Sequence, residues 1–221
     1  MRRLLQLEYR DIVAPIAYGL GLIVLWTLGW LLLRLLAHLI PAFAHGAGPF
    51  FYWFVLKLVF WVAPAILFLR YRGDKFLDAL GARDPKQTLK WGFAAGGVFF
   101  GLNLAVSAFT FSPLPFGFSA LNLYLINPVV EELAFRAAIL PTLARKFSFV
   151  WANTITALLF TLVHFPGWFF QGRLLDMIAA PLGGALSIFI LGWLFGFVAY
   201  RSNSVGAPII AHSLNNLSIP V

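Results

Sequence analysis

The stretch VAPIAYGLGLIVLWTLGWLLLRLL, residues 13–36, decides the fold class, because Arg34 is its only charged residue. A run of about 18 or more apolar residues is long enough to cross a bilayer as a helix. The basic segment MRRLLQLEYR precedes this run, as in a secretory signal peptide. The apolar core of such a signal is only about 7–15 residues long. We therefore interpret residues 13–36 as a retained first membrane span.

The rest of the chain has the same character. Of its 221 residues, 61% are hydrophobic and 11% are charged, whereas soluble domains have about 45–50% and about 25%. The sequence predicts an all-α, polytopic transmembrane helix bundle of about seven spans, formed by a single membrane-embedded domain over residues 1–221. The expected spans are residues 13–36, 50–69, 91–111, 119–143, 149–170, 179–200 and 206–219.

The basic residues indicate the orientation of these spans. Twelve of the sixteen Lys and Arg residues fall in the N-terminal tail or in connectors on the same side of the predicted spans, and the opposite loops hold only Arg173. Because cytoplasmic loops are rich in Lys and Arg, we expect the N-terminus in the cytoplasm and the C-terminus outside. Basic residues placed between apolar runs indicate membrane topology, so we exclude nucleic acid as a partner. Membrane lipid is the expected surrounding.

One connector, GDKFLDALG, predicts a short helix on the membrane surface, capped by Asp74 and ended by Gly81. The chain has no cysteine, which excludes disulfides, thiolate nucleophiles and thiolate metal sites.

Few ionisable side chains lie inside the expected spans. For Arg34, with His38 four residues on, we expect snorkelling to the interface. Lys57 lies deeper in its span and is expected either to snorkel or to pair with another side chain. Glu131 and Glu132 are the only acidic residues within spans. Ionisable residues inside a membrane are costly and indicate a functional site, the alternative being an ion pair that only joins helices.

Helix geometry predicts different roles for the two glutamates. Glu132 and Arg136 are four residues apart with the acid first, so they stack on one face and form an ion pair. Glu131 points about 100° away at ~3.6 residues per turn and is expected to face a cavity. Asn127 and Pro128 just upstream are expected to kink or restart the helix, which would bring Glu131 close to a helix N-terminus.

Two histidines lie in two other expected spans. In FTLVHFPGW, Phe160 lies one turn before His164 and is expected to fix its ring. In GAPIIAHSLNN, Pro208 begins a helix on which His212 and Asn216 share a face. Asn215 lies off that face and is interpreted as structural.

These residues resemble a known family, the type II CAAX prenyl proteases, also called the CAAX protease and bacteriocin-processing (CPBP) intramembrane peptidases. The family carries the motifs EExxxR, FxxxH and HxxxN on successive membrane helices. The resemblance covers residues 120–221, which form the expected catalytic core. The matching residues here are Glu131, Glu132, Arg136, Phe160, His164, His212 and Asn216.

The resemblance implies peptide-bond hydrolysis by activated water on membrane-associated protein or peptide substrates. Glu131 is the expected general base, with His164 orienting the water, and His212 and Asn216 would donate to the oxyanion. Metal is the alternative, since Glu131, His164 and His212 could bind Zn²⁺ with one position left for water. We favour the metal-free version, because an asparagine suits an oxyanion donor better than a zinc ligand.

Two other function classes stay open. One is a catalytically inactive membrane immunity or binding protein on the same fold. The other is a proton-coupled transporter in which Glu131 and the histidines form a relay. The short loops and small mass suggest a multi-pass protein of a bacterial plasma membrane.

Overall fold

The structure is a computed structural model that describes residues 9–43, 47–81, 84–107 and 116–218. Every regular element within these ranges is helical, which confirms the predicted all-α fold. Arg2 and Arg3 of the basic N-terminal segment lie outside the described residues. Five helical stretches are long and apolar enough to cross a membrane: Asp11–Leu39, Gly48–Arg72, Pro85–Val106, Phe149–Phe170 and Ala185–Ser202.

The five stretches correspond to five of the seven expected spans. The other two expected spans are helical but differ in kind. The stretch from Phe118 to Leu143 is helical but carries the charges of Glu131, Glu132 and Arg136. The last helix, Gly206–Leu217, has only 12 residues, which corresponds to about 18 Å at 1.5 Å per residue and is short for a hydrocarbon core of about 30 Å.

The chain divides into two compact units, Met1–Phe60 with Ala138–Gly196, and Trp61–Ala137 with Phe197–Val221. We call them unit 1 and unit 2. The complete helices of unit 1 are η1 (Tyr9–Val13), α2 (Ala14–Leu39), η2 (Pro41–Phe43), α3 (Ala47–Lys57), α9 (Leu140–Leu143), α10 (Phe149–Leu162), α11 (Phe165–Phe170) and α12 (Leu174–Ala179). Those of unit 2 are α4 (Ala63–Arg72), α5 (Phe76–Ala79), α6 (Pro85–Val106), α7 (Phe118–Leu121), η4 (Asn122–Ile126), α8 (Asn127–Glu132) and α14 (Gly206–Leu217). The boundary falls within η3 (Leu58–Val62), η5 (Leu133–Ile139) and α13 (Ala185–Ser202).

Unit 1 is built on α2, which packs against α10 and α11. Gly19 of α2 lets the helices approach closely, because a Cβ added there would lie 2.8 Å from Leu159 Cδ1. An aromatic cluster joins α2, α3 and α11, with Trp30 stacked on Phe170 at 6.0 Å and tilted against Trp53 at 4.7 Å. Arg34, which was expected to snorkel to the interface, donates a hydrogen bond to the backbone oxygen of Phe170.

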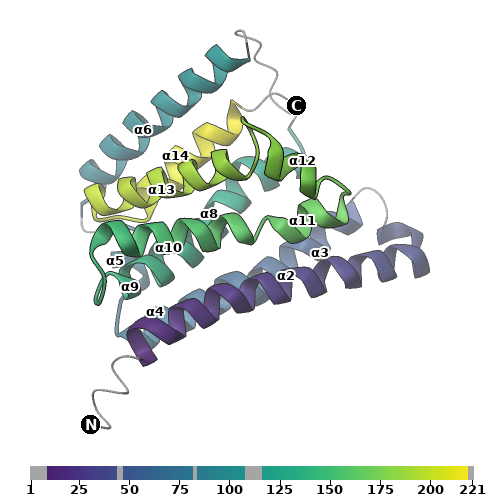
Figure 1. Cartoon of the computed structure of the whole chain (residues 1–221), viewed down its shortest axis with the longest axis horizontal. Coiled ribbons are helices and arrows are strands. Elements are labelled where there is room, and N and C mark those ends of the chain that lie inside the picture. The colour runs from purple at the N-terminus through teal and green to yellow at the C-terminus, as the bar shows by residue number, and fades with distance from the viewer. Residues whose placement is uncertain (1–8, 44–46, 82–83, 108–115, 219–221) are drawn as a thin grey trace. The chain divides into compact units, whose positions relative to one another are not determined.

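The interface between α6 and α14 is the main helix pair of unit 2, and Figure 1 shows the two helices side by side. Gly92 and Gly96 lie one turn apart on α6 and face α14. A Cβ added at Gly92 would lie 2.9 Å from Ile210 Cβ, and one at Gly96 would lie 2.5 Å from Leu214 Cδ1. Small residues four apart let membrane helices pack backbone to backbone. The sequence of α6 thus fixes the position of α14.

The short connector helix is present as α5, and Gly81 ends it in the left-handed region with φ 88°. The predicted cap is wrong, because Lys75 occupies the N-cap position and makes no side-chain capping bond. Asp74 instead pairs with Arg72, Nη2 to Oδ2 at 2.6 Å. The end of α5 is attached to the turn before α14, where the Gly206 N–H donates to Leu80 O at 3.2 Å.

Large apolar side chains cover the outer face of α2. They are exposed at intervals of three or four residues: Leu20, Val24, Leu28, Leu31, Leu35 and Leu39. A soluble protein rarely exposes so large a contiguous apolar surface. This stripe is the surface expected of a helix that faces lipid, and it agrees with an integral membrane protein.

Candidate active site

The segment that carries the glutamates is helical from Phe118 to Leu143 and passes through two π-helical stretches, η4 and η5. A new α-helix, α8, begins at Asn127 as expected, but it follows η4 directly and the backbone stays right-handed through Ile126 and Asn127. The Asn127 N–H reaches back five residues to Asn122 O. A π turn accommodates Pro128, which has no N–H to donate. Glu131 therefore lies four residues after the first residue of α8, in a helical stretch whose backbone continues from η4.

Glu132 and Arg136 form the predicted ion pair. Arg136 Nη1 donates to Glu132 Oε1 at 3.1 Å, and both side chains are fully buried. An uncompensated charge here would be strongly unfavourable, so each residue requires the other. The second oxygen of Glu132, Oε2, is buried and accepts no hydrogen bond from the described residues.

Glu132 has a second partner that the spacing rules did not predict. His212 Nδ1 lies 2.9 Å from Glu132 Oε1, the same oxygen that accepts from Arg136. A carboxylate only accepts, so the proton of this contact belongs to His212 Nδ1. The contact fixes the ring orientation and leaves Nε2 as the nitrogen available for chemistry.

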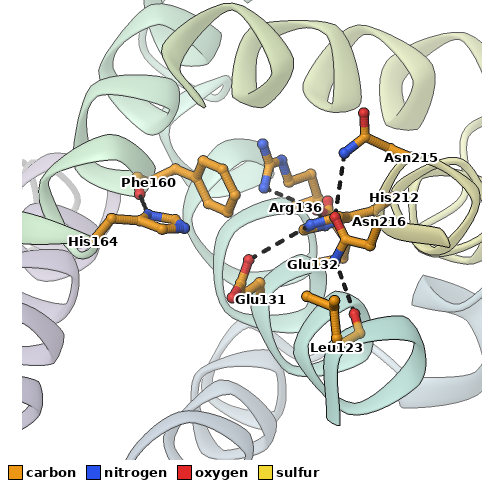
Figure 2. A network of polar contacts seen from close by, with 9 residues as sticks. All are labelled: Leu123, Glu131, Glu132, Arg136, Phe160, His164, His212, Asn215 and Asn216. Carbon is orange, nitrogen blue, oxygen red and sulfur yellow. Dashed lines mark hydrogen bonds and ion pairs between the residues drawn. The ribbon is translucent and has the colours of Figure 1, made fainter. Parts of the chain in front are cut away.

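The other ring nitrogen of His212 faces the second glutamate (Figure 2). His212 Nε2 lies 3.9 Å from Glu131 Oε2. The Glu131 side chain keeps 15% of its surface exposed, whereas that of Glu132 keeps none. The adjacent glutamates thus occupy different environments, with Glu132 bonded to Nδ1 of the histidine and Glu131 facing Nε2.

A chain of amides runs along the C-terminal turn of α14. Asn103 Nδ2 of α6 donates to Asn215 Oδ1 at 3.2 Å and to Ser218 Oγ at 2.9 Å. Asn215 Nδ2 donates to Asn216 Oδ1 at 3.2 Å, and Asn216 Nδ2 donates to the backbone oxygen of Leu123 at 2.9 Å. Figure 2 shows the last two of these links beside His212. The chain orients the Asn216 amide group, with its N–H groups toward η4.

Phe160 and His164 lie in unit 1. The helix stops between α10 and α11, and His164 is the residue that precedes α11. His164 Nδ1 lies 2.8 Å from Phe160 O, and because a carbonyl only accepts, Nδ1 carries the proton. The rings of Phe160 and His164 meet edge to face with centroids 5.1 Å apart, and the centroid of the Trp168 ring lies 5.9 Å from that of His164. Phe160 therefore contacts the histidine ring, as the spacing suggested.

The structure thus gathers Glu131, Glu132, Arg136, His212 and Asn216 in unit 2. Sequence reasoning did not identify Asn103, although a lone amide in an expected span is the same signal that singled out the histidines. The backbone oxygen of Leu123 was also missed. Pro128 is the signal that could have found it, because a proline in a helix leaves a carbonyl without its donor.

The zinc alternative needs Glu131, His164 and His212 together. Among the described residues there is no group of three or more His, Asp or Glu side chains arranged to hold a metal ion. Unit 2 supplies two of the three predicted ligands, Glu131 and His212, and their nearest atoms are 3.9 Å apart. The third predicted ligand, His164, lies in unit 1.

Comparisons with known proteins support the motifs. Residues 112–218 match the family model described as "Type II CAAX prenyl endopeptidase Rce1-like". The protein named "Putative membrane peptidase YdiL" of Bacillus subtilis (strain 168) is 27% identical over 97 residues, which make up 44% of this chain and 34% of that protein. The chain therefore spans about a third of the length of this curated relative. No solved structure matches the chain. All three motifs lie inside residues 112–218, the segment that is similar to this type II CAAX prenyl endopeptidase Rce1-like family.

Proposed function

We propose that the protein is an intramembrane endopeptidase that hydrolyses peptide bonds of membrane-associated, CAAX-type or other, substrates with water activated by Glu131. The family match and the apolar helices support a membrane-embedded peptidase. The observation that carries the reaction is the pair formed by Glu131 and His212. A carboxylate and an oriented imidazole face each other in unit 2 without bonding directly.

The distance between these two groups suits a shared oxygen atom. At 3.9 Å, Glu131 Oε2 and His212 Nε2 are too far apart for a direct hydrogen bond. One oxygen atom about 2.8 Å from each of them fits the gap, as a bridging water does. A reacting oxygen held there contacts a general base and a potential donor at once, which is the arrangement that acyl transfer to water requires.

In the proposed reaction, Glu131 removes a proton from the water, and the water oxygen attacks the carbonyl carbon of the scissile bond. The negative charge that develops on the carbonyl oxygen is stabilised by N–H donors. His212 Nε2 donates when the ring carries a proton on both nitrogens, and Asn216 donates through the N–H that it does not use on Leu123 O. The C–N bond then breaks, and the leaving amine takes up the proton through Glu131 or His164.

Glu132 and Arg136 support this reaction without touching the substrate. Glu132 Oε1 holds His212 Nδ1 at 2.9 Å, and Arg136 neutralises the buried carboxylate. A histidine held by a buried carboxylate keeps one tautomer and one orientation, as in other acid–base sites. His164 has the equivalent support from Phe160 O, and we propose that its Nε2 orients the water.

The test uses purified protein in liposomes with a panel of quenched fluorescent peptides that end in a CAAX sequence, with and without an S-prenyl group. Mass spectrometry identifies the cleaved bond. We expect the parent protein to produce defined fragments and Glu131→Gln to lose turnover by about 10²–10⁴, the usual contribution of a general base.

Asp176→Asn is the matched control, because it makes the same kind of carboxylate-to-amide change at an exposed residue of α12 in unit 1. It should retain full turnover. A comparison of protein termini in membranes from cells with the parent or the Glu131→Gln protein extends the search beyond the panel. The proposal fails if neither experiment yields a product that depends on Glu131. Uptake of a solute driven by a proton gradient would favour the transporter alternative.

A further inference from the structure

Two prolines lie within the helical stretch that carries Glu131 and Glu132, and each lacks a backbone N–H donor. Pro128 lies at the start of α8, and Pro141 lies in α9. A proline inside a helix leaves a carbonyl of the preceding turn without its N–H partner. A buried carbonyl without a donor is unfavourable, so native proteins nearly always supply another one.

At Pro128 the orphaned carbonyl is that of Leu123. Its donor in an α-helix would be the Asn127 N–H, but that group bonds to Asn122 O in the π turn. Its donor in a π-helix would be the N–H of residue 128, which proline lacks. Asn216 Nδ2 occupies this position, 2.9 Å from Leu123 O. A side chain of α14 therefore replaces a missing backbone donor of the glutamate segment.

In α-helical pairing the missing N–H of Pro141 would bond to Ala137 O, four residues earlier. Arg72 Nη1 donates to Ala137 O at 3.0 Å. The arginine itself is held by Asp74, Nη2 to Oδ2 at 2.6 Å, and only 8% of its side chain is exposed. A guanidinium of α4 thus replaces the missing donor at the other end of the segment.

The donor side chains are themselves oriented. Asn215 Nδ2 donates to Asn216 Oδ1, which fixes the amide of Asn216 with its nitrogen toward Leu123 O. Asn103 holds Asn215 in turn, Nδ2 to Oδ1 at 3.2 Å. The glutamates lie between the two replaced donors along the chain, at three and four residues from Pro128.

We propose that Asn216 and Arg72 are positioning residues that supply the backbone donors missing at Pro128 and Pro141, and that these two bonds hold the glutamate segment against α14 and α4. The effect of this positioning on catalysis rests on the proposed peptidase function. The replacement of backbone donors by Asn216 and Arg72 does not depend on that function. It predicts that each side chain is energetically coupled to its own proline.

Double-variant cycles measure this coupling by thermal unfolding of the detergent-solubilised full chain. We expect Asn216→Ala to lower the apparent melting temperature by on the order of 5 °C, because it leaves a carbonyl without a donor. In the Pro128→Ala background the same change should cost less than half as much, since a backbone N–H is again available for Leu123 O. Arg72→Met should behave in the same way with Pro141→Ala, which keeps the proposal testable at one end if a variant at the other fails to fold.

Pro85→Ala is the control for proline removal. Pro85 is the first residue of α6, where an N–H has no intrahelical partner in any case, so this change must leave the cost of Asn216→Ala unaltered. Equal losses from Asn216→Ala in the parent and Pro128→Ala backgrounds would overturn the assignment of Asn216, and equal losses from Arg72→Met would overturn that of Arg72. Peptidase turnover, read separately, tests the proposed function. A turnover defect of Asn216→Ala that persists while its stability defect is relieved identifies oxyanion donation by the same amide.

Discussion

Replacing Glu132 with glutamine removes the negative charge of a carboxylate that accepts hydrogen bonds from two side chains. Oε1 accepts from Arg136 Nη1 at 3.1 Å and from His212 Nδ1 at 2.9 Å, and the side chain is fully buried. Glutamine has the same shape, and its NH₂ group replaces Oε2, which accepts no bond from the described residues. The substitution therefore changes the charge opposite Arg136 and little else.

The expected loss is large compared with the stability of a typical protein. Removing one partner of a buried ion pair costs about 3–5 kcal/mol, out of a total of about 5–15 kcal/mol. Glu131→Gln is the matched control, because it is the same chemical change one residue away. Within the described residues, the polar contact of Glu131 is its 3.9 Å approach to His212, which is longer than a hydrogen bond. Its replacement should therefore alter the free energy of unfolding by less than about 1 kcal/mol.

The measurement is denaturant unfolding of the parent and both variants in the same detergent. Glu132→Gln with Arg136→Met should be more stable than Glu132→Gln alone, since the double variant leaves no unpaired buried cation. Equal stability of Glu132→Gln and Glu131→Gln would refute the view that Glu132 is the anchor of this network.

Two further predictions concern packing and metal. Gly96→Ala should destabilise the protein by about 1–3 kcal/mol through overpacking of α6 on α14, because its Cβ would lie 2.5 Å from Leu214 Cδ1, whereas Gly97→Ala, with no neighbour within 4 Å, should not. Thermal unfolding distinguishes the two, and equal behaviour contradicts the close helix contact. If Glu131 activates water without a metal, chelators leave turnover unchanged. Stoichiometric zinc by elemental analysis together with chelator-sensitive turnover would contradict this.

The helical membrane fold could be predicted from the sequence because it depends on local composition. The run at residues 13–36 and four other apolar segments appear as helices long enough to cross a membrane. The path of the backbone near Pro128 could not be predicted in the same way. Residue spacing indicates that a proline disturbs a helix, but only the structure shows that a π turn absorbs the disturbance and keeps the helix continuous.

The candidate site was predictable to the extent that it lies within one helix. The spacing of Glu132 and Arg136 predicts their ion pair, and the structure contains it. The contact of Glu132 with His212 joins residues 80 positions apart, and helix periodicity carries no information at that range. From the sequence, Arg72 was assigned only to the basic connector. Its hydrogen bond to Ala137 O could not be predicted, because every residue has a backbone oxygen and the residue type does not mark this one.

The central claim is that Glu131 is the general base of a peptidase. The most direct measurement is the turnover of one identified substrate by the parent protein and by Glu131→Gln, each corrected for its folded fraction. The account predicts a fall of at least about 100-fold with unchanged unfolding behaviour. Turnover by the folded Glu131→Gln protein within a few-fold of the parent would contradict it.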